Sequence, residues 1–403
     1  MKSTRSTRST FALSTLGAAL LAAGAFTTPA ALAAEPGKLL IWYSTDGAKG
    51  MQKIGAEFTA KTGIPVTVEA PEDGPGKFQQ AAAGGKGPDI WIWAHDRAGE
   101  WIAGGLIVPV TPSKKVQADI DPLAWKAFSI GGKTWGYPYS IEAISLVYNK
   151  ALVKTPPKTF EDVLALDKQL QPQGKRAILW DYTNTYFTWP LLAAGGGYAF
   201  KQKPDGTYDG TDVGVNNAGA VAGVELLNKL LREKYMPLES GYAEMEGAMA
   251  QGKVAMMING PWSWDNLKKA NIDYGVAKIP AVNGHKASPF VGVKGAMINK
   301  ASPNKDLAVE FIENFMLTPK GLKALNDAES IAVPASKAFF EEVKSNPNIA
   351  ATMASAQDGA PMPNNPEMGR FWSAMVSSLG NIMDGRQSPK EAMDAAAKRI
   401  LSK

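Results

Sequence analysis

The chain has 403 residues, enough for two or three domains, and its 45% hydrophobic and 20% charged content excludes a disordered tail protein and a multi-span membrane protein. It has no cysteine and only two histidines, His95 and His285, which excludes disulfides, a thiolate nucleophile, a zinc–thiolate site and a multi-histidine metal site. We therefore expect no metal and no cofactor, and the formal net charge of +5 is concentrated at the N-terminus.

The N-terminal residues have the pattern of a secretory signal peptide. Basic residues in the first ten positions precede an apolar run at 11–26, which is too short and too rich in alanine and glycine for a membrane anchor. An A-x-A cleavage site follows at 31–33, so we assign residues 1–33 to the signal peptide. This segment holds three basic residues and no acid, so its removal lowers the net charge from +5 to +2 and leaves little reason to expect nucleic-acid binding.

Strand and helix patterns alternate after the predicted cleavage site. The expected elements are a strand at 38–43, a helix at 50–61, a strand at 65–70, a helix at 77–83, a strand at 89–94 and a helix at 96–103. Gly63 lies just past the first helix, where a left-handed C-cap is expected. The order β-α-β-α-β predicts an α/β fold with a parallel sheet and right-handed crossovers.

The second half of the chain is predicted to be mostly helical. Helices are expected to start at Ser302-Pro303, Thr318-Pro319 and Ser388-Pro389, because each pair places a cap residue before a proline. Glu391 completes a capping box at the last of these starts. An additional buried strand is expected at 253–259.

No flexible linker separates the two halves of the chain. The extended run at 139–148 is the best candidate for an ordered crossing between two lobes, and it carries one carboxylate, Glu142. Two half-domains joined by several extended crossings can hinge, whereas a single linker would let them tumble.

Ligands of open parallel sheets bind beyond the carboxyl ends of the strands. The residues at these positions are Ser44, Thr45, Asp46, Trp93, Ala94, His95, Asp96, Arg97, Gly260, Pro261, Trp262 and Trp264. The set mixes aromatic rings with carboxylates and an arginine. It lacks a phosphate loop, because Ala127 replaces the first glycine of the Walker-like segment that ends at Gly132-Lys133-Thr134.

Tryptophans beside planar charged groups suit a carbohydrate. The C–H face of a sugar ring stacks on an aromatic ring, a contact worth roughly 1 kcal/mol beyond the area buried. The hydroxyl rim of the sugar needs paired donors and acceptors, which arginine and the carboxylates supply. The set therefore favours a carbohydrate ligand.

The charged candidates also have purely structural interpretations. Asp96 is about as well suited to cap the helix that it begins, and Arg97 could simply pair with Asp96 on the surface. Glu142 could be a solvated edge residue. His95 is better explained by structural hydrogen bonds than by a role as a base.

Most of the eleven tryptophans are expected to pack in or near the core. Trp42, Trp91 and Trp189 lie inside apolar runs, so we expect all three to be buried. We expect Trp93 to face the opposite side of its strand from Trp91, which leaves one of the two rings open to a ligand.

Several long strings in this sequence resemble one protein family. They are PDIWIWAHDR (88–97), YFTWPLLAAGGGYAF (186–200), INGPWSW (258–264), PFVGVKGAMINKASPNK (289–305) and NIAATMASAQ (348–357). In this order and spacing they resemble the maltose/maltodextrin-binding proteins, which are periplasmic solute-binding proteins of ABC sugar importers. The likeness extends from about Gly37 to the C-terminus.

The resemblance implies a two-lobed periplasmic-binding-protein fold, in which each lobe is a sheet flanked by helices and extended crossings form the hinge. We expect residues 35–141 with 296–341 to form the N-terminal lobe, and residues 146–290 with 347–403 to form the C-terminal lobe. The implied partners are maltose or maltodextrin, an inner-membrane ABC permease and, as a secondary partner, a chemoreceptor. The implied protein is a periplasmic monomer without catalytic residues.

The sugar contacts of the family carry over onto matching positions of this chain. They are Asp46, Trp93, Asp96, Arg97, Glu142, Tyr186, Tyr242, Trp262, Met362 and Trp372. By resemblance, Asp46 accepts from hydroxyls, Trp93 stacks beside the charged pair, and Glu142 is the carboxylate between the lobes. Tyr242 and Met362 match weaker contacts further along the cleft.

The chain departs from the family pattern at several cleft positions. Ser44 replaces an asparagine, Gly47 a lysine, Pro75 a glutamate, Asn184 an acid and Val376 an arginine. We interpret the joint loss of a lysine and of acids as the loss of one charged partnership. The aromatic floor is kept, so we expect an oligosaccharide ligand, in particular an α-glucan fragment.

Two other functions remain open on the sequence. An exported glycoside hydrolase would need paired carboxylates such as Asp96 and Glu142. Arg97 argues against it, since an adjacent cation is expected to keep Asp96 ionised. The same scaffold could also bind another solute, such as trehalose, sucrose or a polyol.

Overall fold

The computed structural model describes residues 33–238 and 240–402. The predicted signal peptide lies outside the described residues, except for its last residue, Ala33. Within the described ranges, no helix is long and apolar enough to cross a membrane.

Strands and helices alternate along most of the described chain. The strands are β1 (Leu39–Trp42), β2 (Val66–Glu69), β3 (Ile90–Ala94), β4 (Ser129–Ile130), β5 (Lys133–Thr134), β6 (Tyr137–Ala143), β7 (Ser145–Asn149), β8 (Arg176–Leu179), β9 (Lys201–Gln202), β10 (Tyr208–Asp209), β11 (Val254–Asn259), β12 (Tyr274–Ala277), β13 (Phe290–Ile298), β14 (Val333–Pro334) and β15 (Ala360–Pro361). The α-helices are α1 (Thr45–Thr62), α2 (Gly74–Ala83), α3 (Ala98–Ala103), α4 (Lys114–Asp119), α5 (Pro122–Ala127), α6 (Phe160–Leu170), α7 (Thr185–Ala194), α8 (Ala218–Arg232), α9 (Tyr242–Ala250), α10 (Trp264–Lys269), α11 (Lys305–Phe311), α12 (Pro319–Ala328), α13 (Lys337–Val343), α14 (Pro347–Asp358), α15 (Met368–Met383) and α16 (Pro389–Leu401). Short 3₁₀ helices are η1 (His95–Arg97), η2 (Gln171–Gln173) and η3 (Pro261–Ser263), and η4 (Ile312–Met316) is π-helical.

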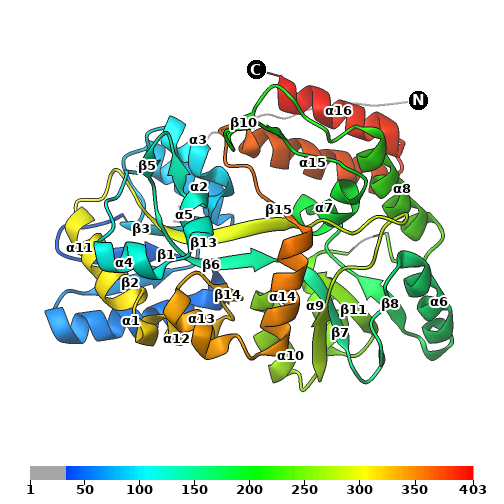
Figure 1. The fold of residues 1–403 in the computed structure, drawn as a ribbon, viewed down its shortest axis with the longest axis horizontal. Helices are drawn as coiled ribbons and strands as arrows, with labels where there is room; N and C mark the ends of the chain where they lie inside the picture. Colours follow the sequence, from blue (N-terminus) through cyan, green and yellow to red (C-terminus); the bar gives the residue numbers. More distant parts are fainter. Residues whose placement is uncertain (1–32, 239, 403) are drawn as a thin grey trace, which may run out of the picture. The chain divides into compact units, whose positions relative to one another are not determined.

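The larger sheet has the strand order β14-β6-β13-β3-β1-β2, and β15 pairs with β13. Strand β1 runs parallel to β2 and β3, as the alternating pattern predicted, and Gly63 ends α1 in the left-handed region. The sheet as a whole is mixed, so the prediction of a parallel sheet is correct only for β1, β2 and β3. Strand β13 runs antiparallel to β3 and to β6, which lies beside it (Figure 1). Strand β13 enters from a distant part of the sequence, so the crossover rule for consecutive units does not apply to it.

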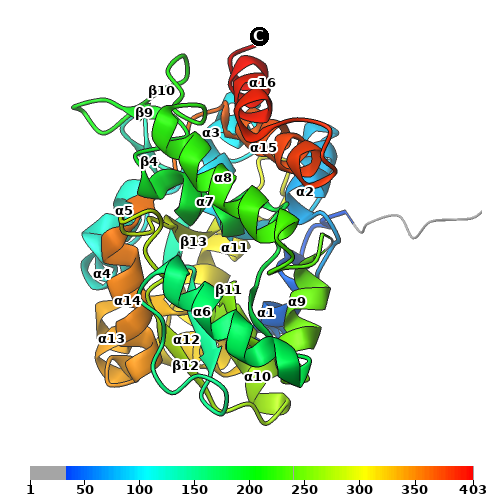
Figure 2. The same ribbon diagram turned by 90° about the vertical axis from the view of Figure 1, so that its right-hand side faces the viewer.

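The smaller sheet has the strand order β12-β7-β11-β8. Strand β11 is the strand predicted at 253–259, and all of its residues are buried. It runs antiparallel to β7 and parallel to β8. Helix α6 packs on β8, and α9 packs on β11 (Figure 2).

The run at 139–148 crosses from one sheet to the other, as predicted. Its first part lies in β6 of the larger sheet, and its second part lies in β7 of the smaller sheet. Ile144, between the two strands, is fully buried. Strand β13 makes a second connection, because its first residue, Phe290, stacks on Trp189 of α7 with ring centroids 4.5 Å apart.

Each sheet has its own hydrophobic core. The larger-sheet core includes Trp42 and Trp91, and the smaller-sheet core includes Trp189, so all three predicted core tryptophans are buried. Ile141 of the crossing strand packs against both cores. The fold is therefore α/β with two lobes, each a sheet flanked by helices. The lobe boundaries expected from the sequence stay a proposal.

Two of the three predicted helix starts are correct. Thr318 caps α12, and Ser388 caps α16 in a capping box with Glu391. The predicted start at Ser302-Pro303 is wrong, since α11 begins at Lys305 after Asn304.

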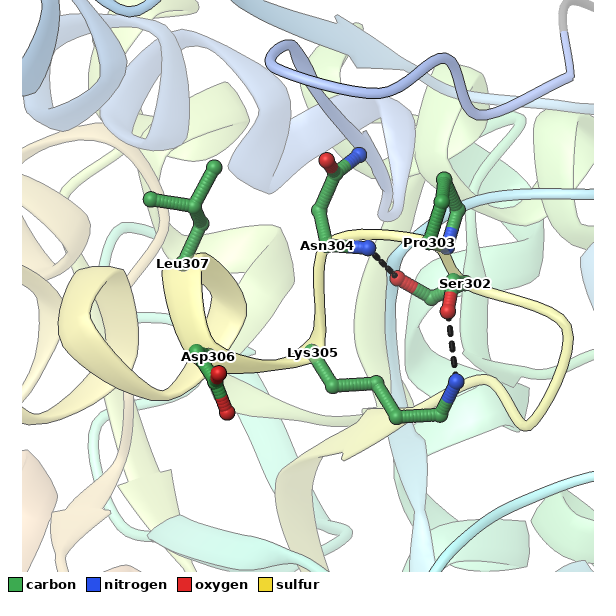
Figure 3. A pocket seen from close by; sticks show the side chains of 6 residues that line it. All are labelled: Ser302, Pro303, Asn304, Lys305, Asp306 and Leu307. Carbon is green, nitrogen blue, oxygen red and sulfur yellow. Dashed lines mark hydrogen bonds between the residues drawn. The ribbon is translucent and has the colours of Figure 1, made fainter.

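The side chain of Ser302 is used elsewhere (Figure 3). Its hydroxyl donates to the buried carboxylate of Asp89 and accepts from the backbone N–H of Asn304. The Asn304 amide in turn donates to the backbone carbonyls of Glu35 and Lys38. The surface hollow around Ser302 is therefore a structural junction that ties residues 35–38 to the larger sheet.

Candidate functional site

The end of β3 places Asp96 against a tryptophan from the other core. Asp96 lies in η1 with 5% of its surface exposed. The indole Nε1–H of Trp372, on α15, donates to Oδ2 of Asp96 at 2.9 Å. This hydrogen bond joins an edge of the larger sheet to a helix that packs on the smaller-sheet core.

Burial and the neighbouring charge act in opposite directions on the pKa of Asp96. Burial raises its pKa from the ordinary value of 3.8 to about 6, although the Trp372 hydrogen bond and the Arg97 charge lower it. Arg97 thus favours the ionised carboxylate, as expected, but the penalty for burying the charge is larger. The N-cap interpretation is wrong, since neither η1 nor α3 has a side-chain cap.

Arg97 does not pair with Asp96 on the surface. Its guanidinium donates to Glu100 at 2.9 Å and to Gln79 at 2.6 Å, and it lies over the ring of Trp101. The side chain is thus held by its own lobe, between α2 and α3. Its predicted role as a direct sugar contact stays a prediction.

Trp91 and Trp93 share one face of β3. Their rings stack with centroids 5.4 Å apart and an interplanar angle of 7°. The interpretation that they face opposite sides is wrong, because residues two apart on a strand point to the same side. Trp91 is fully buried and Trp93 is half-buried, so the inner ring supports the outer one.

A buried ion network occupies the middle of the crossing. Glu142, on β6, is 5% exposed and is not a solvated edge residue. Its Oε1 lies 3.0 Å from Nζ of Lys294, on β13, which also donates to Glu329 at 2.8 Å. Burial raises the pKa of Glu142, Lys294 lowers it, and Glu329 raises it again. The carboxylate between the lobes is thus held by a lysine that the sequence interpretation did not include.

The aromatic candidates of the smaller-sheet lobe form one group. The ring centroid of Tyr186, at the start of α7, lies 6.2 Å from that of Trp262, which follows β11. Phe187 contacts both Trp262 and Tyr242. Burial raises the pKa of Tyr186 far above its ordinary value, and the charge of Glu142 raises it further. The group therefore borders the ion network.

Asp46 faces polar groups of both lobes. It lies exposed in the first turn of α1. Partial desolvation by the surrounding protein and the charge of Glu329 raise the pKa of Asp46, while Lys294 and Lys269 lower it. Tyr242, whose hydroxyl donates to Glu246 at 2.9 Å, is also influenced by the charge of Asp46. Asp46 and Tyr242 therefore belong to one polar region.

His95 and Met362 have structural roles, as expected for His95. The backbone N–H of Val293 donates to Nδ1 of His95 at 3.1 Å, so Nε2 carries the proton and donates to the carbonyl of Met362 at 3.0 Å. Burial lowers the pKa of His95 to about 4, which keeps the ring neutral. Met362 is buried, with 4% of its surface exposed.

Three positions that depart from the family pattern have local explanations. Asn184 and Ser44 cap α7 and α1 through their side chains. Gly47 lies so close to Tyr43 that a Cβ atom at this position would be 1.9 Å from its ring. The interpretation that one charged partnership was lost stays a prediction, and a different ion pair, Lys294 with Glu142, is present in the fold.

Sequence reasoning missed Lys294 and Glu329. The signal for Lys294 was a single charge inside an otherwise apolar strand, Phe290–Ile298. A charge in such a strand is seldom tolerated without a partner. Glu329, 3% exposed, gave no comparable signal because it follows a helix end.

The raised pKa of Asp96 predicts the effect of Asp96→Asn on stability. Between about pH 4 and 6 the Asp96 carboxyl is protonated to a greater extent in the folded protein than in the unfolded chain. The free energy of unfolding of the wild type therefore falls as the pH rises through this range, and above pH 6 the full cost of the buried charge is present. Arg97, Trp372 and Tyr186 face this carboxylate. We expect Asp96→Asn to be more stable than wild type by up to about 3 kcal/mol at pH 8, with the gain shrinking below pH 6.

Urea unfolding of both proteins at pH 8 and pH 5 measures this difference. A variant that is less stable than wild type at pH 8 would show that the Asp96 charge is well compensated.

The chain matches known proteins over most of its length. Residues 53–351 match the family described as bacterial extracellular solute-binding proteins. The galactooligosaccharide-binding protein of Bacillus subtilis is 30% identical over 89% of this chain and 88% of its own. The maltodextrin-binding protein MdxE of the same species is 32% identical over 78% of this chain and 77% of its own. The maltotriose-binding protein of Pyrococcus abyssi is 28% identical over 88% of this chain and 79% of its own.

Proposed function

We propose that this chain, which belongs to the family of bacterial extracellular solute-binding proteins, captures a maltodextrin between its two lobes. It then delivers the maltodextrin to an ABC importer. Relatives named for maltotriose and maltodextrin support an α-glucan oligosaccharide as the ligand. The galactooligosaccharide-binding relative makes a galactan fragment the nearest alternative, with trehalose and sucrose behind it.

The observation that carries the proposal is the joining of carboxylates and aromatic rings from both lobes. Asp96 accepts from Trp372 at 2.9 Å, and the Glu142–Lys294 pair lies against the ring of Trp262. Aromatic faces and hydrogen-bonding carboxylates are the two groups that a pyranose requires. Residues of both lobes would touch one sugar.

Capture then works by domain closure. We assign residues 35–141 with 296–341 to the N-terminal lobe and residues 146–290 with 347–403 to the C-terminal lobe. The crossing from β6 to β7 and strand β13 serve as the hinge. A sugar that contacts both lobes favours the closed state. The free-energy shift of the open–closed equilibrium can be no larger than the difference between the sugar's binding free energies for the two states.

The ligand residues of this proposal are the ten carried over from the family. Asp96, Glu142 and Asp46 accept from sugar hydroxyls, and Trp93, Tyr186, Trp262 and Trp372 provide the stacking surface. Arg97, Tyr242 and Met362 make weaker or indirect contacts, since the Arg97 side chain is bound to Glu100 and Met362 is buried.

We further propose that the protein is a periplasmic monomer that binds without turnover. A permease is its main partner, and a chemoreceptor is a possible second one. The relatives are solute-binding proteins rather than enzymes. The raised pKa of Asp96 is compatible with a general acid, so turnover needs its own test.

Tryptophan fluorescence of the ligand-free mature protein tests binding and chromatography tests turnover. Maltose, maltotriose, a galactooligosaccharide, trehalose and sucrose are each titrated, and maltotriose is then incubated with the protein overnight. We expect saturable quenching or enhancement with the glucans and intact maltotriose afterwards. Release of glucose or maltose would establish a hydrolase, and saturation by another sugar alone would change the ligand.

A further inference from the structure

Lys294 lies at an irregular point of the larger sheet. It is paired with Ala94 of β3 and with Ser140 of β6, and the register between β13 and β6 shifts directly after it. The extra residue at this shift is Tyr139 of β6, and irregularities of this kind are common beside functional sites. Because Lys294 pairs with Ala94, which lies two residues before Asp96, it lies next to the strand end that forms the candidate site.

The ammonium of Lys294 contacts three side chains from three parts of the fold. It lies 3.0 Å from Glu142 Oε1 and 2.8 Å from Glu329 Oε1. It also lies 5.6 Å from the ring centroid of Trp262, which belongs to the smaller-sheet lobe. A sugar that stacks on Trp262 would come within hydrogen-bond reach of this ammonium.

The network is only partly satisfied among the described residues. Oε1 of Glu142 is buried, and its described partner is the Lys294 ammonium at 3.0 Å. Lys294 has three N–H donors, and the described contacts engage Glu142 and Glu329. The lysine side chain is 16% exposed, so water or a ligand can reach it. One N–H donor of Lys294 thus remains beside the Glu142 carboxylate.

Stability alone is a poor explanation for this arrangement. Replacing a buried ion network by apolar residues of similar volume is often neutral or stabilising, because desolvation offsets the attraction between the charges. The opposite end of the network is already complete, since Glu329 also accepts from Tyr43 and Ser44. The incomplete end is the one that faces Trp262.

We propose that Lys294 is a further ligand-contacting, specificity-determining residue of this site, where it and Glu142 recognise two adjacent hydroxyls of the sugar. Glu142 accepts from one hydroxyl, and Lys294 donates to the oxygen of its neighbour. The pair is complementary to a vicinal diol and selects sugars that carry both hydroxyls. This inference rests on the proposed function.

Calorimetric titration of Lys294→Met with maltose and its monodeoxy analogues tests the proposal. We expect at least tenfold weaker maltose binding than wild type, and partial recovery in Lys294→Arg. For wild type, one monodeoxy analogue should bind at least tenfold more weakly than maltose. For Lys294→Met, the same analogue and maltose should bind with equal affinity. A purely structural lysine would not produce this coupling to a single hydroxyl. Lys300→Met, an exposed lysine beyond the end of β13, is the control.

The outcomes separate the two proposals. Equal maltose affinity in Lys294→Met and Lys300→Met, or equal weakening for every analogue, overturns the role of Lys294. A wild type that binds none of these sugars overturns the proposed function instead. If Lys294→Met does not fold, Lys294→Met with Glu329→Gln removes one unpaired carboxylate, and the same coupling is measured in this double variant.

Discussion

Trp262→Ala is expected to weaken the binding of maltotriose by roughly 100-fold. The ring is half-buried in η3, near the rings of Tyr186 and Phe187 and the Lys294 ammonium. A stacked sugar gains the area buried on the ring and an aromatic contribution, together about 3 kcal/mol. The alanine variant forfeits this contribution, and about 3 kcal/mol corresponds to roughly two orders of magnitude in Kd.

Calorimetric titration with maltotriose measures the loss. Trp125→Ala on α5 is the matched control, because this ring packs on the larger-sheet core and lies outside the candidate site. Equal affinities in wild type and Trp262→Ala would exclude the ring from the ligand surface.

Gly47→Ala is expected to destabilise the protein by about 3 kcal/mol, although alanine is usually the better helix residue. A Cβ atom at position 47 would lie 1.9 Å from the ring of Tyr43 and 2.5 Å from Oε2 of Glu329. Neither group can move freely, because the Tyr43 hydroxyl is 2.7 Å from that of Tyr139 and Glu329 is bound to Lys294. Overpacking of a buried site costs about 1–3 kcal/mol and sometimes more.

Urea unfolding compares Gly47→Ala with Gly247→Ala. Gly247 lies in α9, and a Cβ atom there would meet nothing within 4 Å. The control should therefore gain up to about 1 kcal/mol from helix propensity. Two variants of equal stability would mean that the Tyr43–Glu329 contact adapts easily, and that the glycine is not required to form the ion network.

The early part of the fold could be predicted because its signals are local. Strands β1, β2 and β3 and helix α1 follow from short-range patterns of apolar residues, and the C-cap at Gly63 follows from one residue type. The antiparallel entry of β13 could not be predicted, because its partners β3 and β6 lie far away in the sequence.

The interactions of the candidate site residues could not be predicted from the sequence. Residues next to each other in sequence, Asp96 and Arg97, were expected to pair, yet Asp96 is bound by Trp372 and Arg97 by Glu100. The sequence does not reveal the burial that raises the pKa of Asp96. Lys294 became visible only when the antiparallel pairing of β13 with β6 brought it to Glu142.

The most direct test of the central claim is a calorimetric titration of the ligand-free mature protein, residues 34–403, with maltotriose. The account predicts saturable binding of one sugar per chain with a negative heat-capacity change, since aromatic surface of both lobes is buried. No detectable heat with maltotriose or with a galactooligosaccharide, from a protein shown to be folded, would contradict capture of an oligosaccharide between the lobes.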